Sequence, residues 1–207
     1  MSDAVEKGHI KGVAFREFVV WFEQNHGRSQ IERILQLAPP NVLDDLDLDR
    51  DREAWGIVIS RWYPVAPVHR LLDALLATRT DAERTRIAAQ GTRAVADRMF
   101  TGIYKTLFGM LGSPERWARH SQRLWSVNYD TGELRIRLLG PNSAESSVSN
   151  WPGHHPFLCE SLLYSGIAVF EAMGCQHVSG TRVRCIERGG EACTRIFTWS
   201  GERVGRE

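Results

Sequence analysis

The sequence predicts an α+β fold, in which a helical N-terminal half precedes an antiparallel sheet packed on a central helix. In the stretches 11–25 and 30–37, apolar residues recur at three- and four-residue spacing. After residue 126 the pattern changes to alternating segments around one long apolar helix. Helices followed by strands are typical of this class. We expect residues 1–207 to form one domain, comprising a mainly helical half (1–125), a strand–helix–hairpin half (126–200) and a tail (201–207).

The first two helices are predicted over 11–25 and 30–37. The apolar face of the first comprises Val13, Phe15, Phe18, Trp21 and Phe22. Ser29 is of a type that caps helix N-termini, and Pro39-Pro40 should end the second helix.

The rest of this half is expected to be helical too. The acidic run at 43–52 is interpreted as a solvated turn, because it lacks the glycine and the terminal glutamate of a calcium loop. Short helices are predicted at 53–62 and 66–78, and a long helix at 82–110. Ser113-Pro114, a capping residue followed by proline, indicates the start of another helix.

The second half should contain three strands and one helix. Asp130-Thr131-Gly132 is a turn signal, and the residues after it alternate as in a strand up to 139. Residues 140–153 are polar and contain proline and glycine, so we expect a loop there. A helix is predicted over 155–174, followed by a hairpin with strands near 180–187 and 192–199.

Composition narrows the functional classes. The net charge is +1, which gives no electrostatic reason to expect nucleic-acid binding. Neither a signal peptide nor an apolar run of about 18 residues is present, so we expect a cytoplasmic protein without a membrane span. In that compartment the four cysteines are better explained as thiols or metal ligands than as disulfides.

Three of these cysteines, Cys159, Cys185 and Cys193, are candidate metal ligands. A three-residue loop at 188–190 would place Cys185 opposite Cys193 with Cβ atoms about 5 Å apart. A two- or four-residue loop would put the two cysteines on opposite faces. If the central helix packs on this face, Cys159 joins them. Candidates for a fourth zinc ligand are Cys175, His177, His154 and His155. The alternative is that the cysteines are buried free thiols.

The segments CESLLYSGIAVFEAMG and VRCIERGGEACTRIF resemble the superfamily that groups 4-vinyl-reductase-type ligand domains, heme-NO-binding domains and TRAPP trafficking subunits. In phenol-sensing members of the vinyl-reductase type, three cysteines and a glutamate hold zinc. The resemblance implies the same role for Cys159, Cys185 and Cys193, but Arg182 stands where the glutamate should be.

Two segments resemble the heme-NO-binding type, namely IKGVAFREFVVWFEQNHG and PFLCESLLYSGIAVFEAMG. Its Tyr-x-Ser-x-Arg motif is absent from 129–150, and Tyr104 and Lys105 stand near where its proximal histidine should be. On these residues we do not expect heme. The overall layout is also similar to a family of uncharacterised, myxobacteria-associated proteins.

These observations predict a non-enzymatic cytosolic module that binds or senses a small molecule and passes the signal to a protein partner. We expect an apolar molecule or acyl chain between the central helix and the sheet, lined by Trp125, Phe157, Leu163, Gly166 and Phe170. The alternatives are a TRAPP-like adaptor that forms a homodimer without ligand and, third, a heme-based gas sensor. The arginine-rich hairpin, with Arg182, Arg184, Arg188 and Arg195, is explained by a solvent-facing side of the sheet or by anion binding.

Overall fold

The computed structural model describes residues 8–37, 42–49, 51–99 and 112–200. Within these ranges the N-terminal half is mainly helical, as predicted. Its elements are β1 (His9–Lys11), α1 (Val13–His26), α2 (Arg28–Leu37), α3 (Val42–Leu46), the 3-10 helix η1 (Glu53–Gly56), β2 (Trp62–Pro64), α4 (Val65–Leu76), α5 (Asp81–Met99) and α7 (Pro114–Trp125).

The second half is a four-stranded antiparallel sheet and one long helix, which lies between the second and third of these strands in the sequence. Its elements are β3 (Glu133–Gly140), β4 (Ser143–Ser149), α8 (Pro156–Ala172), β5 (Gln176–Arg184), the 3-10 helix η2 (Ile186–Arg188) and β6 (Ala192–Ser200). The strand order is β3-β4-β6-β5. The predicted α+β class, with an antiparallel sheet packed on a central helix, is confirmed.

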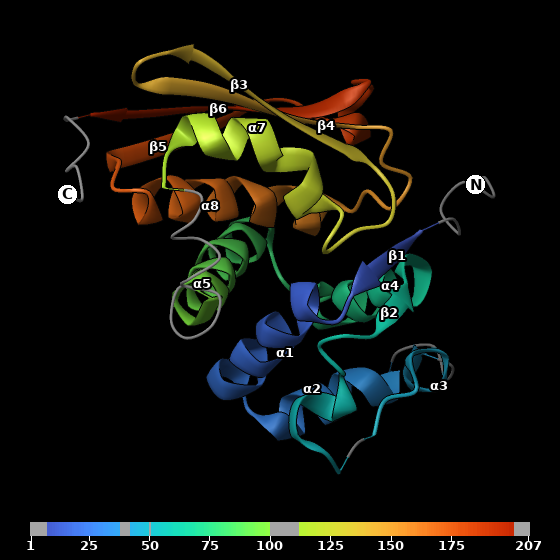
Figure 1. Ribbon diagram of the computed structural model, residues 1–207. Coiled ribbons are helices and arrows are strands. Elements are labelled where there is room, and N and C mark those ends of the chain that lie inside the picture. Colours follow the sequence, from blue (N-terminus) through green and yellow to red (C-terminus); the bar gives the residue numbers. More distant parts are fainter. Residues whose placement is uncertain (1–7, 38–41, 50, 100–111, 201–207) are drawn as a thin grey trace.

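The elements stack in layers (Figure 1). Helices α7 and α8 lie side by side on one face of the sheet, and α5 lies beneath α8. The remaining helices of the first half form the layer farthest from the sheet. Helix α8 is therefore covered on two sides, by the sheet and by helices, which explains why its sequence is apolar around most of its circumference.

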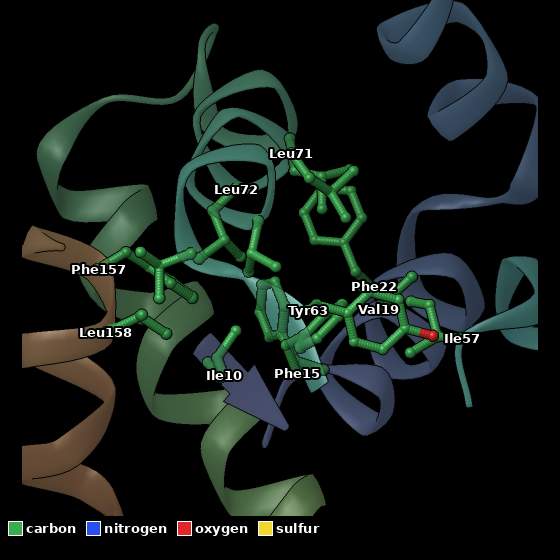
Figure 2. Close-up of a cluster of buried hydrophobic side chains, with 14 of the residues drawn as sticks. Ile10, Phe15, Val19, Phe22, Ile57, Tyr63, Leu71, Leu72, Phe157 and Leu158 are labelled. Carbon is green, nitrogen blue, oxygen red and sulfur yellow. The ribbon is translucent and has the colours of Figure 1, made fainter. Parts of the chain in front are cut away.

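The two larger core clusters of the described residues follow from this layering. Figure 2 shows part of the larger one, in which Phe15 and Phe22 of α1 meet side chains from β1, β2, α4 and α8. The smaller cluster fills the space between α8 and the sheet, with contributions from α7. Its buried members include Trp117, Phe170, Phe197 and Trp199.

Several predictions of local structure need correction. Residues 140–153 are not all loop, because β4 lies within them; its Ala144, Ser146 and Val148 alternate inward, but two of the three are too small or polar to stand out in a hydrophobic pattern. Residues 53–62 form only a 3-10 turn and the start of β2. The long helix is described as α5 as far as Met99, and residues 100–110 of that prediction lie outside the described residues.

In the part of the chain that the structure describes, none of the helices combines the length and the hydropathy needed to cross a membrane.

Candidate metal centre and apolar cavity

Three cysteines and one histidine converge at the end of the sheet nearest the start of α8. Each of His154, Cys159, Cys185 and Cys193 offers one ligand atom, and these atoms all lie within 4.8 Å of one another. The Sγ atom of Cys185 is 3.9 Å from that of Cys159, 3.8 Å from that of Cys193 and 3.7 Å from Nε2 of His154. The three thiols are free and buried.

The local structure explains this convergence. Cys159 lies in the first turn of α8, where its N–H donates to the carbonyl of His155, and His154 precedes that turn. Cys185 follows β5, and Cys193 is the second residue of β6. The connecting turn is longer than the predicted three residues, since it includes η2 and Gly189 with a φ of 80°. It nevertheless brings both thiols to the face of the sheet that α8 covers.

The spacing of the ligand atoms around Cys185 fits a tetrahedral zinc ion. Zinc–sulfur bonds of about 2.3 Å in a tetrahedron place two sulfurs about 3.8 Å apart. The two sulfur–sulfur distances that involve Cys185, 3.8 and 3.9 Å, match that separation. A disulfide needs about 2.05 Å, so the three cysteines are not bridged at these distances.

Two of the thiol sulfurs accept hydrogen bonds from nitrogen donors, one of them a buried guanidinium. Nη2 of Arg195 donates to Sγ of Cys159 at 3.2 Å, and the backbone N–H of Ile186 donates to Sγ of Cys193 at 3.4 Å. The hydrogen bond from Cys193, together with the charge of Arg195, lowers the pKa of the Cys159 thiol. The bond to Cys159 and burial raise the pKa of Cys193. The cluster therefore readily carries a first negative charge.

Among the candidates for a fourth ligand, only His154 joins the three thiols. His155 instead caps α8, with Nδ1 accepting from the N–H of Phe157, and its Nε2 contacts Asp73 at 3.1 Å. Cys175 is buried in the apolar cluster beneath the sheet, and His177 lies on β5 with a φ of 49°. The metal-ligand role itself stays a prediction.

An apolar cavity lies on the helical side of α8. Two hollows of about 200 and about 70 Å³ share six lining residues from α1, α5, α8 and the segment after α7. The shared residues are Ala14, Thr92, Val95, Tyr129, Leu162 and Ser165. The described lining contains no aspartate, glutamate, histidine, lysine or cysteine.

The position predicted for the ligand needs correction. Trp125 lines the larger hollow and Phe157 the smaller one, but Leu163, Gly166 and Phe170 face the sheet instead. There the space is filled, because a Cβ on Gly166 would lie 2.3 Å from Cζ of Phe197. The glycine in mid-helix thus marks close packing against a phenylalanine and not room for a ligand.

Two residues of the site were missed or misinterpreted from the sequence. The sequence left Arg195 to either a solvent-facing side of the sheet or anion binding; it is only 1% exposed, so the first explanation does not hold for this residue. Its position gave a signal, since Cys193, Arg195, Phe197 and Trp199 alternate along β6 and share the inward face. Tyr129 stacks on Trp125, with ring centroids 4.1 Å apart, and burial raises its pKa.

Comparison with known proteins identifies the fold. Neither a family model nor a curated protein matches the sequence. Among solved structures, the unliganded Fe(II) H-NOX protein of K. algicida matches with a TM-score of 0.66 and 12% identity, over 95% of this chain and 100% of that one. The S. oneidensis H-NOX protein in its Fe(II)NO state matches at 0.61 and 15%, over 93% and 100%. A third structure, which probes heme distortion in the H-NOX family, matches at 0.55 and 10%, over 96% and 99%.

The chain therefore has the H-NOX, or heme-NO-binding, fold, and that part of the predicted resemblance is confirmed. The vinyl-reductase, TRAPP and myxobacterial resemblances stay predictions. The expectation that heme is absent has to be corrected, because the structures that share this fold are those of heme-binding domains. The cavity offers one described side chain of a type that ligates heme iron, the phenol of Tyr129.

Proposed function

We propose that the chain is a non-enzymatic small-molecule-sensing domain whose ligand occupies the cavity between α1, α5, α7 and α8. The observation that carries this proposal is the apolar cavity itself, on the helical face of α8 in an H-NOX fold. Apolar walls with a few polar groups are usual for small-molecule sites. Hydroxyls, one amide and two indole N–H groups are the polar side-chain groups of the described lining, which suits binding better than general acid–base catalysis.

The ligand is proposed to be apolar, and heme is the first candidate to test. Tyr129 would be the described residue nearest in chemistry to an axial ligand, and Trp125 and Leu162 would pack against the ring. What heme supplies in this fold is an iron atom that binds a small gas, as in the S. oneidensis protein solved in its Fe(II)NO state.

The cluster of His154, Cys159, Cys185 and Cys193 is proposed to hold one structural zinc ion. Three thiolates and one imidazole are a common closed set for structural zinc. The ion would tie the start of α8 to the β5–β6 turn. The support is geometric, namely the match between the two sulfur–sulfur distances at Cys185 and a tetrahedral site.

Native mass spectrometry of protein expressed with added heme precursor and without an affinity metal tests both sites. We expect the mass of one zinc ion, absent in Cys185→Ser, together with an organic mass that is retained in that variant. A Soret band would identify the organic mass as heme. Replacing Ala96, which lines the larger hollow, by Trp should expel the organic ligand and leave the zinc bound. Protein purified with neither mass would contradict the proposal.

The protein partner and the homodimer remain predictions of the same proposal. Ligand binding to a sensing domain is expected to change its affinity for a protein partner or for a second copy of itself. Light scattering of ligand-loaded and ligand-free protein measures this. A dimer that is independent of ligand would favour the adaptor interpretation instead.

A further inference from the structure

Arg195 is a buried cation without a carboxylate partner. It lies on β6 between Cys193 and Phe197, faces α8 and is 1% exposed. Within the described ranges, no aspartate or glutamate forms an ion pair with it. An unpaired guanidinium in the interior is strongly unfavourable, so its counter-charge has to come from another group.

The hydrogen bonds of Arg195 show which group this is. Nη2 donates to Sγ of Cys159 at 3.2 Å and to the carbonyl oxygen of Cys159 at 3.0 Å. Nη1 lies 3.5 Å from the carbonyl oxygen of Cys193, and Nε has no partner. Of these acceptors, only the sulfur can carry a full negative charge.

We infer that the positive charge of Arg195 balances the net negative charge of a centre in which three thiolates and one imidazole bind a divalent ion. This inference rests on the zinc site proposed above. Three thiolates and a neutral imidazole around a divalent ion leave one net negative charge, which one guanidinium balances. Arg195 is a positioning residue here, because it acts on the metal through Cys159.

The neighbouring Arg182 also interacts with Cys159 and Cys185, but it shares its charge with a carboxylate. Its Nη1 is 3.0 Å from Oε2 of Glu160, so its charge already has a carboxylate partner. Arg182 and Glu160 together carry no net charge, so Arg195 is the cation that offsets the negative charge of the cluster. The thiolates stabilise the buried cation, and the cation stabilises the thiolates. Such outer partners of metal ligands typically contribute about 10- to 100-fold to metal affinity.

Zinc affinity of the full chain, measured by competition with a chromophoric chelator, tests this inference. Arg195→Met should bind zinc about 10- to 100-fold more weakly than the wild type. Arg195→Lys, which keeps the charge, should recover a large part of the loss. Arg135→Met, which removes an exposed arginine paired with Glu133, should bind like the wild type. If Arg195→Met does not fold, Arg195→Gln provides the neutral variant.

A second background separates charge from structure. Cys185→His leaves two thiolates and two imidazoles, a neutral centre with a divalent ion, and Cys185 has no hydrogen bond with Arg195 among those described. In that background Arg195→Met should cost less than about threefold, because no net negative charge remains to be balanced. An equal loss in both backgrounds would show a merely structural role and overturn the inference.

The two proposals fail in different ways. A wild-type protein that takes up no zinc overturns the metal centre itself. A wild-type protein that binds one zinc ion, with an affinity that Arg195→Met leaves unchanged, overturns only the role of Arg195.

Discussion

Gly166 is the point of closest approach between α8 and the sheet. Its missing side chain is replaced in space by the ring of Phe197, and Gly180 of β5 meets the same ring and Leu163. Phe197 is buried and cannot move aside without disturbing Phe170 and Trp199. The helix accepts the conformational cost of a glycine because a larger residue would push it off the sheet.

We therefore expect Gly166→Val to lower the free energy of unfolding by about 1–3 kcal/mol or more, through overpacking against Phe197. Urea denaturation measures the change. Gly140→Ala is the matched control, because a Cβ there would meet only Oγ of Ser143 at 3.5 Å. An unchanged midpoint in Gly166→Val would mean that α8 and the sheet are less tightly packed than described.

His69 should make stability depend on pH. Burial, with the charge of His155 as a second cause, lowers the pKa of His69 from 6.5 to about 4. The ring centroids of the two histidines are 4.9 Å apart, and Nε2 of His69 has no partner among the described residues. Between these two pKa values the unfolded chain binds a proton that the folded chain does not. Through His69, the free energy of unfolding is therefore highest above about pH 6.5 and decreases as the pH falls to about 4.

On this basis the free energy of unfolding should fall by about 3 kcal/mol from this residue alone between pH 7 and pH 4. His69→Gln should flatten that slope, whereas His120→Gln, at an exposed position, should leave it intact. Urea titrations at a series of pH values provide the measurement. Parallel curves for His69→Gln and the wild type would assign the acid sensitivity to other groups.

At the scale of elements, α7 shows how a short local pattern sets a helix boundary. Ser113 has an extended conformation, its side chain accepts from the N–H of Arg116 at 3.3 Å, and Pro114 occupies the first helical position. The helix places Trp117 under the sheet and Trp125 beside the cavity. Its start therefore affects the position of both.

Replacing Ser113 by Ala should cost about 1 kcal/mol, because one N–H at the helix start loses its acceptor. Ser113→Asp should retain most of the stability, since a carboxylate caps equally well and also suits the positive end of the helix. Thermal unfolding of the three proteins tests this. Equal losses in both variants would show that the cap contributes little and that packing holds the helix start.

The β5–β6 hairpin and α8 are joined by the thiol cluster rather than by a large apolar contact at this end. Among the residues that the structure describes, Ile186 is the one further hydrophobic residue packed against the cluster of Cys159, Cys185 and Cys193. In the whole molecule this end of the sheet should therefore depend on metal for its stability.

Zinc removal should accordingly lower the melting temperature of the whole chain. Zinc at 100 times its dissociation constant contributes about 2.7 kcal/mol. For a chain of this size that corresponds to about 5–10 °C. We expect this loss after chelation and its recovery on adding zinc, measured by calorimetry, whereas Cys185→Ser should melt alike with and without zinc. A wild-type transition unaffected by chelation would contradict a structural metal.

The sequence by itself determined the elements whose patterns are local. The helix at Val13–His26, the cap at Ser113 and the strand after Gly132 follow from periodicity, capping chemistry and turn residues that lie next to one another in the chain. Strand β4 did not follow, because Ser and Ala at its inward positions carry little hydrophobic signal, and only pairing with β3 and β6 gives it a regular conformation.

The sites were decided by tertiary structure. The sequence nominated Cys159, Cys185 and Cys193, but it left four candidates for a fourth ligand, and only the packing of α8 on the hairpin selects His154. It also suggested the sheet side of α8 for a ligand, where Phe197 fills the space. An apolar helix buried on two sides has no pattern that tells which side is filled and which is hollow, because both depend on side chains brought in from distant segments.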